Sequence, residues 1–122
     1  RIHPPLYGQQ MLQKLSSYRI ALNYHNRHTG DYACNMRLFE ATGVGCALIT
    51  DHKSDLHEYF ETEKEILSYK NKNELVSCIE LLINDPKLAN KLSVEAQSKT
   101  LNEFNTEKQI LILLKILELA IK

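Results

Sequence analysis

Three polar side chains suited to ligand binding lie within a short stretch of the chain. Asn35, Arg37 and Glu40 fall at the start of segment 35–43, whose pattern predicts a helix that ends at Gly43. The first N–H groups of a helix have no internal hydrogen-bond partner, and the helix dipole favours anions there. We therefore expect a phosphate group to bind at the N–H groups of residues 35–37, with Arg37 adding a charge-assisted hydrogen bond.

Glu40 is not explained by such a phosphate site, because a carboxylate facing the phosphate would repel it. A carboxylate does accept hydrogen bonds from two adjacent hydroxyls, such as those of a ribose, so Arg37 and Glu40 together are typical of a nucleotide site. In the alternative interpretation, Glu40 only stabilises the helix through its dipole, and Arg37 is a surface residue. Spacing alone slightly favours this alternative.

The elements that would position these residues follow from the apolar pattern. Segments 19–24, 46–50 and 65–69 are predicted strands, and helices are expected over 7–17, 35–43 and 73–84 and from Pro86 towards Phe104. Ser54 or Asp55 caps a further short helix that ends near residue 60, and a capping box, Thr106-x-x-Gln109, opens the last helix. Connections of this length suit parallel strands, which predicts an α/β fold: half of a doubly wound sheet of about three strands, with extra C-terminal helices.

The carboxyl ends of the strands are the expected ligand edge of such a sheet. The loop 25–34 follows the first strand there and is longer than most connections, which makes it a functional candidate. His25 and His28 are candidate cleft residues in this loop, although a loop histidine is more often solvated. Gly43-Val-Gly45 closes a helix instead of opening one, so we interpret it as a tight turn and not as a dinucleotide fingerprint.

Length and composition describe one ordinary folded domain. The 122 residues are 43% hydrophobic and 25% charged, and 15 basic and 15 acidic residues give a formal net charge of zero. This balance excludes a general attraction to nucleic acid or to a membrane surface. All four arginines lie in the first 37 residues, where Asp31 is the only acid. Arginine suits phosphate and carboxylate, so this part of the chain is expected to face an anion, although chance explains the counts equally well.

The cysteines and histidines indicate the redox environment of the protein and whether it binds a metal. The three cysteines, Cys34, Cys46 and Cys78, stand far apart without a Cys-x-x-Cys motif, which indicates reduced thiols in a cytoplasmic protein. No acidic or sulfur partner completes a metal set near His25 and His28, so no metal is expected. No segment reaches the ~20 apolar residues of a membrane span, and no signal peptide opens the chain. Because the chain starts without Met, we expect a fragment of something longer.

A resemblance to group 1 glycosyltransferases of the GT-B fold is carried by two stretches, "ALNYHNRHTGDYACNMRLFEATGVGCALITDHKSDLHEYFETEKEILSY" and "NELVSCIELLINDPKLANKLSVEAQSKTLNEF". The branch that the chain resembles is that of the spore-maturation-protein-like glycosyltransferases, which carry a similar N-x-R-x-F-E-A-x-G-x-G segment. The resemblance covers most of residues 7–105, and that segment is its most specific part. It implies two Rossmann-like domains, of which the C-terminal one binds most of the nucleotide-sugar donor.

The resemblance also implies roles for individual residues. Glu40 would hold the donor ribose, and backbone N–H groups of Asn35, Met36 and Arg37 would meet the diphosphate. Arg37 and the helix start would then stabilise the departing nucleoside diphosphate. No side chain is a convincing general base, so the catalytic residue is left open, and His25 is a further candidate in the donor site.

One position departs from the family pattern. Many relatives place a second glutamate, which contacts the donor sugar, eight positions before the equivalent of Glu40, and Tyr32 occupies that position here. Either Asp31 replaces it from a shifted loop, or this branch holds its sugar differently. The donor nucleotide, the sugar and the stereochemistry of transfer are therefore left open.

The expected organisation is a C-terminal part of a nucleotide-sugar-binding Rossmann-like domain over 1–105, followed by a C-terminal amphipathic helix over 106–122. The expected function is donor binding in a bacterial glycosyltransferase that acts on a glycan or another surface acceptor. The fragment would be inactive alone, because the acceptor domain would lie upstream of Arg1. The alternatives are a degenerate glycosyltransferase domain, which Tyr32 keeps open, and a non-catalytic flavodoxin-like or receiver-like interaction domain, which the loop after residue 24 disfavours.

The last helix is apolar almost all round. One stripe, expected to pack on the other helices, consists of Ile110, Leu113, Leu114, Leu117 and Ile121. A second stripe consists of Ile112, Ile116 and Leu119. In GT-B relatives the final helix commonly crosses back to the N-terminal domain. Without that domain, we expect the second stripe to be exposed or covered by another copy, in a weak homodimer through residues 110–121.

Overall fold

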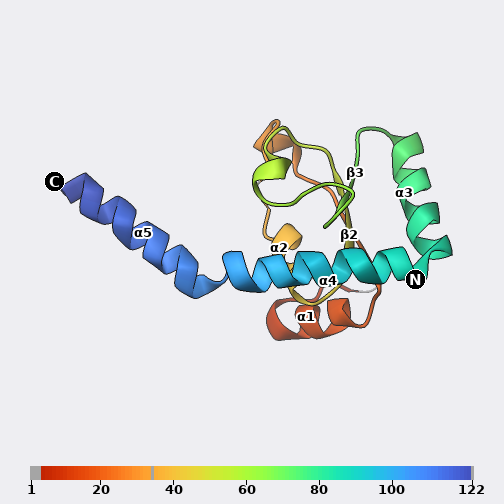
Figure 1. Ribbon diagram of the computed structural model, residues 1–122, viewed down its shortest axis with the longest axis horizontal. Helices are drawn as coiled ribbons and strands as arrows, with labels where there is room; N and C mark the ends of the chain where they lie inside the picture. Colours follow the sequence, from red (N-terminus) through yellow and green to blue (C-terminus); the bar gives the residue numbers. More distant parts are fainter. Residues whose placement is uncertain (1–3, 34, 122) are drawn as a thin grey trace.

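Strands and helices alternate along the chain (Figure 1). The computed structural model describes residues 4–33 and 35–121. The strands are β1 (Ile20–Asn23), β2 (Ala47–Asp51) and β3 (Leu67–Tyr69). The α-helices are α1 (Gly8–Ser16), α2 (Arg37–Gly43), α3 (Lys72–Asn84), α4 (Pro86–Glu103) and α5 (Thr106–Ile121). Two short 3₁₀ turns, η1 (Arg27–Thr29) and η2 (Leu56–Glu58), lie in the loops after β1 and β2.

The three strands form one parallel sheet in the order β1-β2-β3, which confirms the predicted α/β class and half of a doubly wound sheet. β2 lies in the centre and is buried at every position, as its continuous apolar run predicts. Within the described residues, β1 pairs with β2 alone. Its other edge is therefore open, and Leu22 and Tyr24 beside that edge are exposed.

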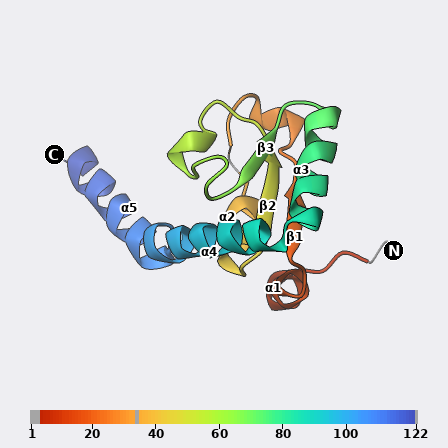
Figure 2. The ribbon, with the colours of Figure 1, turned by 45° about the vertical axis from the view of Figure 1, so that its right-hand side comes forward.

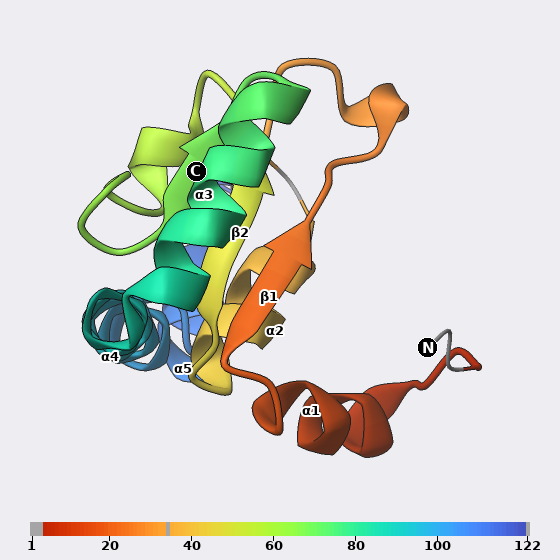
Figure 3. The same cartoon turned by 90° about the vertical axis from the view of Figure 1, so that its right-hand side faces the viewer.

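Each face of the sheet has its own hydrophobic core. Because side chains alternate along a strand, Leu48 of β2 packs in the cluster under α2, whereas Ile49 packs in the cluster under α3. Figure 3 shows α2 and α3 on opposite sides of the sheet. α4 contributes to both clusters, through Ala96 to the first and Leu92 to the second. This helix therefore ties the two layers together.

Helix caps agree with the sequence in one place and differ in two. Pro86 is the first residue of α4, as predicted, and the side chain of Asp85 accepts hydrogen bonds at the start of this helix. The predicted capping box of α5 is wrong, because the side chain of Asn105 accepts the N–H of Lys108 at 2.9 Å. The predicted short helix near residue 60 is the turn η2, which has no side-chain cap within the described part of the chain.

The turn between α2 and β2 depends on Gly45. This residue has a φ of +85°, which favours glycine. The N–H of Cys46 donates to the carbonyl of Ala41, and the N–H of Gly45 donates to that of Thr42. These two bonds form a Schellman motif. The predicted tight turn is therefore confirmed, but its left-handed residue is Gly45 and not Gly43.

α5 extends away from the sheet, as Figures 1 and 2 both show. None of the described residues of α5 is buried, and its large apolar side chains are 47–85% exposed. The prediction that its first stripe packs on the other helices is therefore wrong. The chain bends at residues 104–105, and this bend directs α5 outward.

Candidate functional site

A buried polar cluster lies at the carboxyl ends of β1 and β2. Nδ2 of Asn23 donates to Oγ1 of Thr50 at 3.0 Å, and Oδ1 of Asn23 accepts from Nδ2 of Asn35 at 2.9 Å. Asn23 and Thr50 are both buried. These bonds satisfy groups that would cost roughly 1–3 kcal/mol each if they were left unpaired. Asn35 thereby ties the segment that enters α2 to the end of β1.

His25 belongs to the same cluster, and its side chain is fully enclosed. Its Nδ1 lies 2.6 Å from Oδ1 of Asp51, and its backbone N–H donates to the same oxygen at 2.9 Å. The expectation that a loop histidine is solvated is wrong for His25, because the end of the buried strand β2 supplies a carboxylate acceptor. The same expectation holds for His28, which is exposed.

Tyr69 joins this cluster from β3. Its hydroxyl donates to the backbone carbonyl of Asn23 at 3.3 Å. Burial, with smaller contributions from Asp51 and Tyr24, raises the pKa of Tyr69 above its usual value. The hydroxyl therefore stays protonated at neutral pH and can donate this hydrogen bond.

The segment after β2 holds the loop 25–34 at three further points. Side chains of this segment meet backbone atoms of the loop at each of them. The contacts are Lys53 Nζ to the carbonyl of Gly30 (2.7 Å), Ser54 Oγ to the carbonyl of Asp31 (2.9 Å), and the N–H of Ala33 to Oδ1 of Asp55 (2.6 Å). Sequence reasoning missed these roles. The available signal was the run of polar residues directly after a buried strand, because that run meets the loop at the same sheet edge.

Arg37 and Glu40 pair with each other along the first turn of α2. Nη1 of Arg37 lies 3.3 Å from Oε2 of Glu40, and both side chains are partly exposed. The same nitrogen lies 3.2 Å from Sδ of Met11 in α1. The positive charge beside Glu40 offsets the repulsion that a lone carboxylate would exert on a phosphate at the helix start.

The start of α2 is the predicted anion site, and the N–H groups of Leu38 and Phe39 there donate to the carbonyls of Asn35 and Met36. Met36 is the N-cap residue, and the described residues provide no side-chain hydrogen bond at this cap. The first N–H groups of α2 therefore face no competing side-chain acceptor of their own cap.

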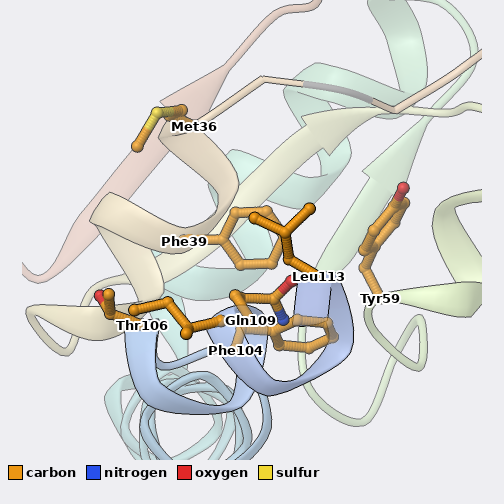
Figure 4. A pocket seen from close by; sticks show the side chains of 8 residues that line it. Met36, Phe39, Tyr59, Phe104, Thr106, Gln109 and Leu113 are labelled. Carbon is orange, nitrogen blue, oxygen red and sulfur yellow. The ribbon is translucent and has the colours of Figure 1, made fainter. Parts of the chain in front are cut away.

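An apolar groove of about 520 Å³ lies between α2 and α5. Its lining is mostly apolar and consists of Met36, Phe39, Tyr59, Phe104, Ile110 and Leu113, together with the polar residues Thr106 and Gln109 (Figure 4). No charged side chain lines the groove. The groove is therefore unsuited to bind phosphate. Among its lining residues, Met36 alone is a predicted phosphate contact, and that contact would be made by its backbone N–H.

The six predicted site residues fall into separate groups. They are His25 and Asn35 in the buried cluster, Met36, Arg37 and Glu40 along the start of α2, and Asp31 on the exposed part of the loop. Among the described residues, no hydrogen bond or ion pair joins Arg37 or Glu40 to His25 or Asp31.

No metal centre is visible within the described residues, where no group of three or more His, Cys, Asp or Glu side chains is arranged to hold an ion. Cys46 and Cys78 are free, and burial raises the pKa of each thiol. Cys34 lies outside the described residues. Over 4–33 and 35–121, no helix combines the length and the apolar character that a transmembrane segment needs.

An open parallel sheet with helices on both faces and polar side chains at its strand ends defines a Rossmann-like α/β domain. The glycosyl transferase-like family matches residues 1–115, and the chain belongs to this family. No curated protein matches the chain.

Comparison with solved structures agrees on the fold. The chain is similar to part of sucrose-phosphate synthase from Thermosynechococcus elongatus, with a TM-score of 0.60 and 23% sequence identity. The match covers 71% of this chain and 23% of that chain. The chain thus spans about a quarter of the structure that it matches. At this identity the likeness concerns the fold alone, and it confirms the predicted Rossmann-like half of a GT-B architecture.

Proposed function

We propose that this chain is the donor-binding portion of a glycosyltransferase that transfers a sugar from a nucleotide-sugar to a glycan or another surface acceptor. The family match over residues 1–115 carries the proposal. In this site, the donor diphosphate meets the N–H groups of residues 35–37, and Glu40 accepts hydrogen bonds from the ribose hydroxyls. The uncapped start of α2 and the cation beside Glu40 support this assignment.

Several finer expectations accompany the proposal. They are the spore-maturation-protein-like branch, a bacterial origin, a cytoplasmic location and an acceptor domain elsewhere in the same polypeptide. The leaving diphosphate is stabilised by Arg37 and by the start of α2, without a metal ion. In this proposal the isolated chain binds a nucleotide weakly and does not transfer sugar, because the acceptor side is absent.

A nucleotide titration followed by amide correlation spectra of the ¹⁵N-labelled chain tests the proposal. UDP, GDP, ADP and CMP are added separately to millimolar concentration, so that weak binding is detected. One of them is expected to shift the amide signals of residues 35–40, and Glu40→Gln to weaken that response. Glu80→Gln, on an exposed position of α3, is the matched control. If none of the four shifts these signals, the result contradicts the proposed donor site and favours the degenerate or non-catalytic alternatives.

A further inference from the structure

Two buried polar atoms at the sheet edge have no hydrogen-bond partner among the described residues. They are Nε2 of His25 and Oδ1 of Asn35. An unsatisfied buried donor or acceptor costs roughly 1–3 kcal/mol, and most such groups in folded proteins are paired. Within residues 4–33 and 35–121, these two atoms are therefore unpaired, whereas the other buried polar side chains are hydrogen-bonded.

Both atoms are hydrogen-bond acceptors. Nδ1 of His25 lies 2.6 Å from a carboxylate oxygen of Asp51, and a carboxylate only accepts, so Nδ1 carries the proton. In the neutral tautomer that this bond selects, Nε2 carries a lone pair. The amide nitrogen of Asn35 donates to Asn23, which leaves Oδ1 as the acceptor of that side chain.

The two acceptors belong to one hydrogen-bonded cluster at the carboxyl ends of β1 and β2. Burial alternates along residues 21–25, where Ala21, Asn23 and His25 are buried and the two residues between them are exposed. Ala21 packs in the cluster under α2, so Asn23, two residues further along the same strand, is on that face. His25 lies beyond the end of β1 and is linked to Asn23 through Thr50 and Asp51, whose Oγ1 and Oδ1 atoms lie 3.4 Å apart. Asn35 reaches the same place through its bond to Asn23. A ligand that enters between β1 and the start of α2 would meet both atoms.

We infer that Nε2 of His25 and Oδ1 of Asn35 form a subsite that accepts hydrogen bonds from hydroxyl groups of the donor sugar. The inference rests on the proposed function, which supplies the sugar. Two acceptors suit hydroxyl groups and disfavour phosphate, whose oxygens are acceptors themselves. Asp51 is a positioning residue, because its carboxylate fixes the proton on Nδ1 and keeps Nε2 free to accept.

Entry of the sugar requires a local movement. Both atoms are covered in the ligand-free chain, but Asn35 as a residue is only partly buried. The Asn35 amide therefore turns towards the ligand as the sugar enters, while His25 stays held by its two bonds to Asp51.

Ring ¹⁵N signals of the histidines, recorded on the folded chain, report directly on this subsite. The probes are UDP-glucose, UDP-galactose, UDP-N-acetylglucosamine and GDP-mannose, each compared with its free nucleoside diphosphate. At least one sugar nucleotide is expected to shift the Nε2 signal of His25, and the free diphosphate to leave it unchanged. A merely structural histidine would respond to neither.

His25→Asn gives the matched variant, because an Asn amide reaches Asp51 as Nδ1 does but lacks Nε2. The affinity for the responding sugar nucleotide is expected to fall about tenfold, or about 1.4 kcal/mol, with the affinity for the free diphosphate unchanged. His28→Asn, at an exposed position of the same loop, is the control. If His25→Asn does not give a folded amide spectrum, Asn35→Ala is expected to show the same selective loss.

The outcomes separate the subsite from the proposed function. Shifted amides at residues 35–40 with an unshifted Nε2 signal for every sugar nucleotide would overturn the subsite and leave the donor site standing. Equal losses of affinity for the sugar nucleotide and the free diphosphate would overturn the assignment to hydroxyl groups. No amide response to any probe would overturn the proposed function, and the subsite with it.

Discussion

Nη1 of Arg37 and Oε2 of Glu40 lie 3.3 Å apart across one turn of α2. An ion pair at this spacing on a partly exposed helix contributes only about 0.3–0.5 kcal/mol to stability. The pair is thus a minor element of the fold. Replacing Glu40 therefore distinguishes its two possible roles. If Glu40 binds the ligand, its loss lowers nucleotide affinity, and if it only stabilises the helix, its loss changes stability alone.

Glu40→Gln is expected to weaken nucleotide binding much more than it lowers stability. The loss of a charged hydrogen-bond partner of the ribose costs about 1.5 kcal/mol or more, whereas the lost ion pair costs a fraction of that. Calorimetric titration and thermal unfolding of the variant measure the two effects. In a full-length enzyme, an unchanged donor KM and kcat would return Glu40 to a structural role.

Gly45→Ala is expected to lower the free energy of unfolding by roughly 1–3 kcal/mol, the usual cost of a strained left-handed residue. The new Cβ would also lie 3.2 Å from Nε2 of Gln97, which donates to the carbonyl of Gly43 at 3.0 Å. Urea unfolding followed by circular dichroism measures the change.

Gly43→Ala is the control for this substitution, and it is expected to raise the free energy of unfolding instead of lowering it. Its Cβ would meet only Cγ2 of Thr100 at 3.6 Å, an ordinary contact, and alanine is favoured over glycine in a helix by about 1 kcal/mol. If Gly43→Ala were the more destabilising of the two, the left-handed position would be wrongly assigned.

Tyr69 makes stability depend on alkaline pH. Its pKa is raised in the folded chain, so its contribution is complete below the unfolded value of about 10 and is lost as the pH rises through the folded value. Urea unfolding at a series of pH values should show a shallower alkaline decline in Tyr69→Phe than in the wild type. Tyr32→Phe, at an exposed position, should keep the wild-type slope.

The isolated chain is expected to self-associate through α5. Its accessible surface of 8717 Å² exceeds the roughly 6,700 Å² expected of a compact monomer of this mass. Ile112, Ile116 and Leu119 of the second stripe are 51%, 57% and 75% exposed. Sedimentation velocity should show association that increases with concentration.

Substitutions within α5 make this prediction specific. Leu119→Gln should weaken the association, whereas Leu111→Gln should leave it nearly unchanged, since Leu111 lies on the side that carries Lys108 and Lys115. A clean monomer of the wild-type chain at high concentration would contradict the prediction.

Local sequence patterns predicted the helices and strands well, but they predicted poorly which of these elements pack against each other. The buried run of β2 and the Asp85-Pro86 start of α4 were predictable, because each is encoded by neighbouring residues. The apolar stripes of α5 indicate faces that favour burial without indicating what would cover them. That is why the helix was predicted and its packing was not.

The candidate site shows the same division. Arg37 and Glu40 are one helical turn apart, so their proximity follows from sequence spacing. His25 and Asp51 are 26 residues apart, and no local pattern encodes their bond. The rule that the carboxyl ends of parallel strands share one edge predicts that the two residues lie in the same region. It does not predict that they bond to each other.

The hydrogen bonds that join the loop 25–34 to Asp51, Lys53, Ser54 and Asp55 have an energetic consequence for ligand binding. Fixing a flexible backbone costs roughly 1–2 kcal/mol per residue, and here folding has met that cost before any ligand arrives. The loop is thus preorganised, and affinity at this edge reflects contacts without a penalty for ordering the backbone. Replacing Lys53 or Asp55 should therefore lower the affinity for a ligand that neither residue contacts.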